Sequence, residues 1–311
     1  MTRLLDVEVR RYLSRRLVRF LVGLAVLGML IAGTVMFFKS HRGTPAEIRA
    51  RQQQAEAHRE ADIRACANGE FGISQSEVPP GQTLEQFCRE QVVGVEIVAE
   101  DPAFHLTNLR DVYLGTNGIL VALFLLLGAS FIGAEWHAGT MTTLLTWEPR
   151  RLRVSLAKLA VGATLAFLGY LALQVLLGLA LTPAAAFRGS TEGVDRAWLA
   201  DSAAFLLRGG AVAAIAATLG GSLAFIGRNT AAALGVLFGY IAIVEPLLRG
   251  LRPGWERWFL FGNLGTFLVG NAGDSAQFSP RSGLAAGLVI GLYAAGIAAV
   301  AVASFRAREV T

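Results

Sequence analysis

The chain has 311 residues, of which 54% are hydrophobic and only 16% are charged, and its mean hydropathy is +0.51. A water-soluble core does not need so much apolar surface, so the composition excludes an ordinary soluble protein and predicts an all-α membrane protein in contact with the lipid bilayer. The net charge of +5 raises the alternative of a nucleic-acid partner. The arginines cluster beside apolar runs and form no separate basic face, so we expect membrane flanks and no nucleic-acid partner.

Six segments meet or approach the length of about 20 apolar residues that a spanning helix needs. We place these spans at 17–38, 112–132, 159–181, 209–227, 231–249 and 284–305. The first run is too long for the apolar part of a signal peptide, and residues 39–42 do not form a cleavage site, so we expect it to be retained. Six spans place both termini on the same side of the membrane.

Basic residues predict the orientation, because short cytoplasmic loops retain Arg and Lys. They gather in the N-terminal tail, between spans two and three, between spans four and five, and after span six. They are Arg3, Arg10, Arg11, Arg15, Arg16 and Arg19; Arg150, Arg151, Arg153 and Lys158; Arg228; and Arg306 and Arg308. We therefore expect a multi-pass protein of the cell membrane with both termini in the cytoplasm.

Residues 1–16 alternate apolar and basic positions at helical spacing. The apolar positions are Leu4, Leu5, Val9, Tyr12 and Leu13, and the basic ones are Arg3, Arg10 and Arg11. The pattern indicates an amphipathic helix on the inner membrane surface, or else a cytoplasmic extension of the first span. Both interpretations stay open.

The segment 39–111 lies outside the cytoplasm in this topology, and we expect it to form a small helical domain. Thr44, with a proline after it and Glu47 three residues on, has the pattern of a capping box, so a helix should begin there and run to about Asn68. Thr83 with Gln86 predicts the start of a second, short helix.

The two cysteines, Cys66 and Cys88, both lie in this segment. Outside the cytoplasm such a pair can persist as a disulfide, which would join the two helices and stabilise the domain by roughly 3 kcal/mol. Two unpaired thiols are the alternative. The four histidines do not lie at ligand spacing from the cysteines, so we expect no metal site.

Spans four and six are rich in small residues, so we expect their faces to pack closely on other helices, of the same chain or of a second copy. Residues 182–208 should form an outer loop and the start of span four. Residues 250–282, between spans five and six, combine aromatic side chains with glycines in a run too broken to span. We expect a re-entrant pair of short helices there, with a seventh span as the weaker alternative.

Polar side chains inside the predicted spans are few, and polar or charged groups within a membrane usually have a structural or functional role. Arg208 and Glu245 lie at matching depth near the outer ends of spans four and five, where they could form an intramembrane ion pair. Arg249, one turn after Glu245, is an equally available partner, and we slightly prefer this local interpretation. We expect Asn117 and Gln174 to form inter-helix hydrogen bonds.

The sequence contains no phosphate loop, no nucleophile elbow, no H-E-x-x-H motif and no paired carboxylates inside the spans. We therefore expect no catalytic residues and no cofactor bound by this chain.

The cytoplasmic loop 133–158 is the most informative stretch. Its spacing from Glu135 to Trp147 is compatible with a helix, which Pro149 would end. One stripe of this helix consists of Trp136, Thr140, Leu144 and Trp147. Such a surface either docks on a partner or lies flat on the lipid headgroups, and the sequence favours neither.

This loop resembles the loop after the second span of ABC-2 type permeases, the membrane subunits of ABC transporters: a Glu, then Gly-Thr, a Leu-rich turn, Pro and basic residues. The six-span layout and the re-entrant element are similar as well. The resemblance implies a coupling helix whose contacts include Glu135, Trp136, Gly139, Thr140, Leu144, Leu145, Arg150 and Arg151. Its partner would be a separate ABC ATPase subunit that binds ATP and Mg, beside a second permease copy, identical or homologous.

The resemblance further implies export of an amphiphilic small molecule such as a drug, an antibiotic or a lipid. The long segment 39–111 departs from the most compact members of that family and leaves the substrate class open. A different class of protein also fits: a membrane sensor or scaffold with a ligand-binding outer domain and a cytoplasmic docking helix.

Overall fold

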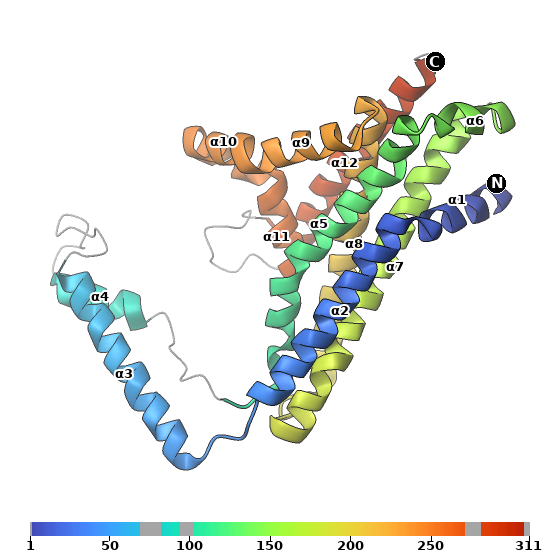
Figure 1. The fold of residues 1–311 in the computed structure, drawn as a ribbon. Coiled ribbons are helices and arrows are strands. Elements are labelled where there is room, and N and C mark those ends of the chain that lie inside the picture. Colours follow the sequence, from blue (N-terminus) through green and yellow to red (C-terminus); the bar gives the residue numbers. More distant parts are fainter. Residues whose placement is uncertain (1, 69–81, 94–101, 271–280, 308–311) are drawn as a thin grey trace. The chain divides into compact units, whose positions relative to one another are not determined.

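The structure is a computed structural model, and it describes residues 2–68, 82–93, 102–270 and 281–307. Within these residues every regular element is helical, apart from one isolated β-bridge between His105 and Ser190 (Figure 1). The α-helices are α1 (Thr2–Ser14), α2 (Arg16–Lys39), α3 (Pro45–Ala67), α4 (Leu84–Val93), α5 (Leu109–His137), α6 (Thr140–Trp147), α7 (Arg151–Pro183), α8 (Arg196–Gly227), α9 (Thr230–Gly239), α10 (Glu245–Leu251), α11 (Leu260–Val269) and α12 (Gly283–Ala307). The short 3-10 and π segments are η2 (Leu106–Asn108), η3 (Ala184–Arg188), η4 (Tyr240–Val244) and η5 (Pro253–Trp258).

Six helical stretches among the described residues are long and apolar enough to cross a membrane, which confirms the predicted number. They are Arg16–Lys39, Leu106–His137, Arg151–Arg188, Arg196–Gly227, Thr230–Leu251 and Gly283–Ala307. Several are longer than the apolar runs that predicted them. The α7 helix begins at Arg151, about two turns before the predicted span at 159, because polar flanks continue a helix beyond its apolar part.

The chain divides into two compact units. The bundle unit comprises Met1–Ala32, Thr107–Ala180 and Gly193–Thr311, and the hairpin unit comprises Gly33–Leu106 and Leu181–Glu192. The helices α2 and α7 each contribute residues to both units.

Glycines bring α5 and α8 into close contact within the bundle unit. A Cβ atom on Gly128 would collide with the backbone of Ala217, and one on Gly220 would collide with the carbonyl of Leu125. Small residues allow helix backbones to approach this closely in lipid. The small-residue face predicted for span four therefore packs on a helix of the same chain.

Polar side chains also join α5 to α7. Tyr170 donates a hydrogen bond to Oδ1 of Asn117 at 2.9 Å, and Nε2 of Gln174 donates to the Tyr113 carbonyl at 3.3 Å. Asn117 and Gln174 thus form inter-helix hydrogen bonds, as predicted.

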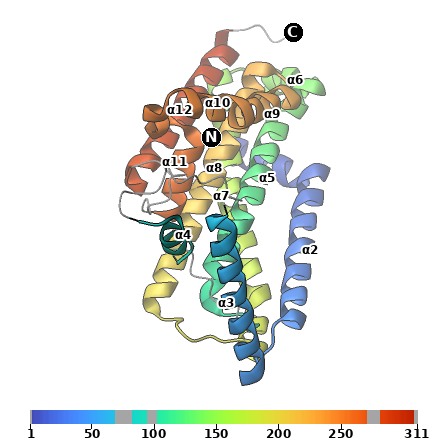
Figure 2. The same cartoon turned by 90° about the vertical axis from the view of Figure 1, so that its left-hand side faces the viewer.

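The elements α9, η4 and α10 follow one another as an almost continuous helix. Figures 1 and 2 show this helix running across the direction of α5 and α8, at a steep angle to the other long helices of the bundle unit. Two short helices, η5 and α11, follow it, which agrees with the pair expected within 250–282. Residues 271–280 of that segment lie outside the described residues.

The carboxylate of Glu245, which is almost fully buried, caps the start of α11. It accepts hydrogen bonds from the backbone N–H groups of Phe261 at 3.0 Å and Gly262 at 3.4 Å, and it pairs with Arg249 at 3.3 Å. Arg208 donates instead to the Val269 carbonyl at 3.5 Å, so it forms no ion pair with Glu245. The reason is local: Arg249 lies one turn away on the same helix, and the first N–H groups of α11 need acceptors.

The helix α3 of the hairpin unit begins at the predicted capping box. Oγ1 of Thr44 accepts from the Glu47 N–H at 3.3 Å, and Oε2 of Glu47 accepts from the Thr44 N–H at 2.8 Å. These hydrogen bonds favour the charged carboxylate and hold the pKa of Glu47 below its ordinary value. Thr83 and Gln86 exchange the same pair of bonds at the start of α4.

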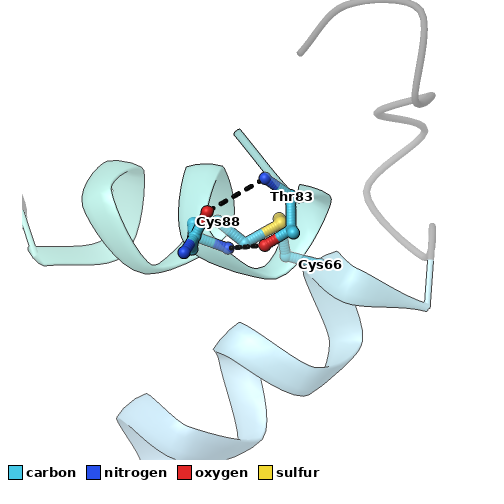
Figure 3. Close-up of a disulfide and its surroundings, with 4 residues drawn as sticks. Cys66, Thr83 and Cys88 are labelled. Carbon is cyan, nitrogen blue, oxygen red and sulfur yellow. Dashed lines mark hydrogen bonds between the residues drawn. A yellow bond between two sulfur atoms is a disulfide. The ribbon is translucent and has the colours of Figure 1, made fainter. Parts of the chain in front are cut away.

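A disulfide joins the end of α3 to α4. It links Cys66 and Cys88, whose Cα atoms lie 5.9 Å apart, and both cysteines are buried (Figure 3). The long helix α3 and the short helix α4 are therefore joined covalently, as the sequence predicted.

Candidate functional site

Four charged side chains meet at one end of the bundle unit, where α1, the end of α5 and the start of α7 come together (Figure 1). Glu8 lies on α1, Arg15 between α1 and α2, Glu135 on α5 and Lys158 on α7. Glu8 and Lys158 are completely buried, and Glu135 is only 7% exposed. We call these four residues the charge cluster.

Lys158 stands at the centre of the charge cluster. Its Nζ atom lies 2.7 Å from Oε2 of Glu8 and 2.7 Å from Oε2 of Glu135. The guanidinium of Arg15 lies 2.9 Å from Oε1 of Glu135 and donates to the Ser130 carbonyl at 2.8 Å. The two carboxylates and two cations of the cluster balance, and the half-exposed Arg11 lies a further 3.5 Å from Oε1 of Glu8; buried charges require such pairing.

Two aromatic rings, of Phe131 and Tyr12, lie beside the charge cluster. The ring of Phe131 lies 4.8 Å from Nζ of Lys158 and 5.0 Å from the Arg15 guanidinium carbon, which are distances for cation–π contact. Tyr12 packs edge-on against the same ring at 5.0 Å. Burial raises the pKa of the Tyr12 phenol well above its ordinary value, so this side chain stays neutral beside the charges.

The charge cluster fixes how α1 is placed. Glu8 and Tyr12, one turn apart, form its buried side, while Leu13 is 52% exposed. The helix ends at Ser14, and Figure 1 shows it turning away from the axis of α2. It is therefore a separate helix held by buried polar groups, and not a straight extension of α2.

The predicted helix from Glu135 to Trp147 is divided in two. The α5 helix ends at His137, and α6 begins after Gly139, which has φ +67° and open space where a side chain would begin. This left-handed conformation suits glycine and breaks the continuous stripe that the spacing predicted. The Thr140 hydroxyl donates to the Glu135 carbonyl at 3.4 Å and so ties α6 to α5.

The short helix α6 has a buried and an exposed side. Met141 and Leu144 are buried, and Leu145 is half-buried. Trp147, at the end of the helix, is 85% exposed, and the Arg150 side chain that follows is exposed as well. Only part of the predicted stripe is thus available to a partner, and Trp147 is its largest element.

Trp136 and Arg151 face the end of α12. The Trp136 ring contacts Phe305 edge-on at 5.9 Å, and the Arg228 guanidinium lies 4.8 Å from the Trp136 ring. Arg151 donates to the Phe305 carbonyl at 3.3 Å. These contacts join both ends of the α5–α6–α7 loop to the C-terminal helix.

Sequence reasoning found Glu135 but missed its partners Arg15 and Lys158, and it missed Glu8, the second partner of Lys158. It treated Lys158 and Arg15 as orientation signals and gave no role to Glu8 within residues 1–16. Two signals were present: Glu8, Tyr12 and Arg15 recur at helical spacing, and Lys158 interrupts an apolar run at the start of α7.

Within the described residues, no group of three or more His, Cys, Asp or Glu side chains is arranged to hold a metal ion. Comparisons with protein-family models, with curated proteins and with solved structures find no match for this chain. A function for this chain therefore has to be inferred from the geometry of the site and from the sequence.

Proposed function

We propose that this chain is the permease subunit of an ABC transporter, with α6 as the helix that couples it to a separate ATPase subunit. The observation that carries the proposal is the charge cluster beside α6, a short helix that leaves the Trp147 side chain exposed. Trp147 is 85% exposed on α6, and Glu135 and Lys158, on the helices that flank α6, are locked together at 2.7 Å. The resemblance of the loop to ABC-2 type permeases supports the same assignment.

The proposed mechanism depends on the short contact between Glu135 and Lys158, which makes the α5–α6–α7 region stiff. A force applied to α6 passes into α5 and α7 together, because the salt bridge between Glu135 and Lys158 resists their separation. Glu8 carries the same displacement to α1. Closure of an ATPase dimer on ATP and Mg would in this way shift the bundle between inward-facing and outward-facing states.

The topology belongs to the same proposal. Both termini and α6 lie in the cytoplasm, residues 39–111 lie outside it, and η5 with α11 forms a re-entrant element. Two copies of the permease, identical or homologous, assemble with two ATPases in the cell membrane. The exported substrate is an amphiphilic small molecule.

The proposal is tested with Trp147→Ala in the chain co-expressed with the ATPase that co-purifies with it. A tryptophan at the centre of an interface contributes about 2 kcal/mol or more, so the ATPase should bind about 30-fold more weakly. Trp255→Ala is the matched control, because Trp255 is 54% exposed on η5 and is not part of the α5–α6–α7 loop. Equal ATPase affinity of the two variants would contradict the docking role.

A second variant tests transmission apart from docking. Glu135→Ala should keep the ATPase bound but uncouple ATP hydrolysis from export of an amphiphilic dye in proteoliposomes. Unchanged export per ATP hydrolysed would show that the charge cluster does not transmit force.

A further inference from the structure

The hairpin unit contains a pocket of about 470 Å³, within the size range of small-molecule sites. Three separate segments line it: Arg42 to Ile48 at the start of α3, Ala103 to His105 before η2, and residues 185–192 after α7. Its polar side chains are Arg42, His105, Ser190, Thr191 and Glu192.

The walls of this pocket are held by hydrogen bonds among the same segments. Ser40, 1% exposed, accepts from the Phe104 N–H at 2.9 Å and donates to the Arg188 carbonyl at 3.4 Å. The backbone of Ser190 donates to the Phe104 carbonyl at 3.1 Å and accepts from the Leu106 N–H at 3.0 Å. A pocket built on such a frame is pre-organised, and little ordering is needed when a ligand binds.

Part of the wall has an unusual backbone. Pro183 ends α7, and η3 continues as a π-helix over Ala184–Arg188, a conformation that recurs at functional sites. The π turn presents the small side chains of Ala185 and Ala186 to the pocket. A Cβ atom on Gly189 would collide with the Phe104 carbonyl, so only glycine allows this approach.

The pocket carries one cation and one anion that do not neutralise each other. Nε of Arg42 donates to the Gly189 carbonyl at 3.4 Å, which leaves the terminal nitrogens of its guanidinium without a partner among the described residues. The Glu192 backbone N–H donates to the Ser190 hydroxyl, while no described residue pairs with the Glu192 carboxylate. A ligand with both an anionic group and an amine carries a group of opposite charge for each of these two pocket-lining side chains.

The surroundings fit a molecule that also has an apolar part. The pocket-lining residues Arg42 and Ala185 follow within three residues of the ends of α2 at Lys39 and of α7 at Pro183, which lie at headgroup depth if these two helices cross the membrane. Phe38 and Phe187 are 68% and 77% exposed close in sequence to the pocket-lining residues. Arg188 lies over the Phe37 ring at 4.6 Å and holds the two helix ends together.

We propose that this pocket binds an amine–phosphate zwitterion, with the phosphate on Arg42 and the primary ammonium on Glu192. A planar guanidinium binds phosphate through two parallel hydrogen bonds, and a carboxylate accepts from an ammonium N–H. The headgroup of phosphatidylethanolamine and free phosphoethanolamine share this chemistry. The exposed phenylalanines favour the lipid as the source.

The test uses native mass spectrometry of the full chain in detergent micelles, titrated with dioleoyl phosphatidylethanolamine, phosphatidylcholine and phosphatidylglycerol. We expect phosphatidylethanolamine to bind best, because choline has no N–H donor and glycerol has no charge for Glu192. Loss of one hydrogen bond to a charged group weakens binding about tenfold.

Arg42→Ala should therefore weaken the binding of all three lipids, whereas Glu192→Gln should abolish the preference for phosphatidylethanolamine. Arg49→Ala and Glu56→Gln, on the exposed surface of α3, are the matched controls.

Displacement by free phosphoethanolamine identifies the source of the ligand. Displacement at concentrations equal to those of the lipid would assign the site to a soluble zwitterion, and failure to displace would assign it to the lipid. Equal binding of the three lipids by the unaltered chain, or unchanged binding by Arg42→Ala and Glu192→Gln, would overturn the proposal. Because no ATPase is present, this result is independent of the proposed transport function.

Discussion

Lys158→Met tests the energetic role of the charge cluster most sharply. The substitution keeps most of the side-chain volume but removes the ammonium that lies 2.7 Å from each of two buried carboxylates. Glu135 would keep Arg15, whereas Glu8 would keep only Arg11, which is 3.5 Å away and 45% exposed. Breaking a buried ion pair by removing one partner costs about 3–5 kcal/mol, so we expect a loss of that size in the free energy of unfolding.

The double variant Glu8→Gln/Lys158→Met separates this effect from a general packing defect. It removes one charge of each sign and leaves the pair of Glu135 and Arg15 intact. It should be more stable than the sum of the two single effects by about 2 kcal/mol, a typical interaction energy for residues in direct contact. The measurement is the apparent free energy of unfolding in mixed micelles with increasing dodecyl sulfate.

An exposed pair on the same helix provides the control. Asp6 and Arg10 lie 3.2 Å apart with side chains 59% and 79% exposed, so the cycle of Asp6→Asn and Arg10→Met should give an interaction energy below about 1 kcal/mol. Additivity within about 0.5 kcal/mol in the Glu8 and Lys158 cycle would refute the reasoning.

Three further predictions test other parts of the fold. Cys66→Ser should lower the free energy of unfolding of the hairpin unit by about 3 kcal/mol, because the bond to Cys88 closes a loop of 22 residues; equal protease resistance of the variant and the oxidised chain would argue against this. Gly220→Val should destabilise the α5–α8 contact by about 1–3 kcal/mol in the same micelle assay, whereas Gly291→Val, at a position where a Cβ meets nothing within 4 Å, should have little effect; the opposite order would mean that the contact is misassigned. Glu245→Ala should cost about 3 kcal/mol by leaving the first N–H groups of α11 unpaired, and Glu245→Gln clearly less; faster amide exchange at the start of α11 would report the loss, and identical exchange in both variants would contradict the capping role.

Much of the fold could be predicted from the sequence, because apolar length and helix-capping patterns are pronounced in this chain. Apolar length predicted the six long helices, and the Thr44 and Thr83 capping patterns located the starts of α3 and α4. The two cysteines on these helices predicted the disulfide. Each signal depends on neighbouring residues or on composition, and needs no knowledge of the three-dimensional arrangement.

The charge cluster was not predictable in the same way. Glu8 and Lys158 are 150 residues apart in the chain, and each alone resembles an ordinary membrane-flanking charge. Only the packing of α1 against α7 brings them together. The break at Gly139 has a similar cause, since a helical spacing of side chains says nothing about the left-handed backbone of one glycine.

The ion pair considered between Arg208 and Glu245 illustrates the same limit, and the local partner Arg249 that we slightly preferred is the one observed. Matching depth in two spans made it plausible, but depth leaves the rotation of each helix undetermined. Arg208 donates to the Val269 carbonyl, and Glu245 pairs with Arg249.

The most direct test of the central claim is gentle purification of the tagged chain from its native membrane, followed by mass spectrometry of what stays bound and an ATPase assay on the complex. The permease assignment predicts an ATPase subunit with a phosphate loop in near-equal amount, and hydrolysis that an amphiphilic compound stimulates. Recovery of the chain alone, or with a kinase or another regulator, would contradict it and favour the membrane sensor.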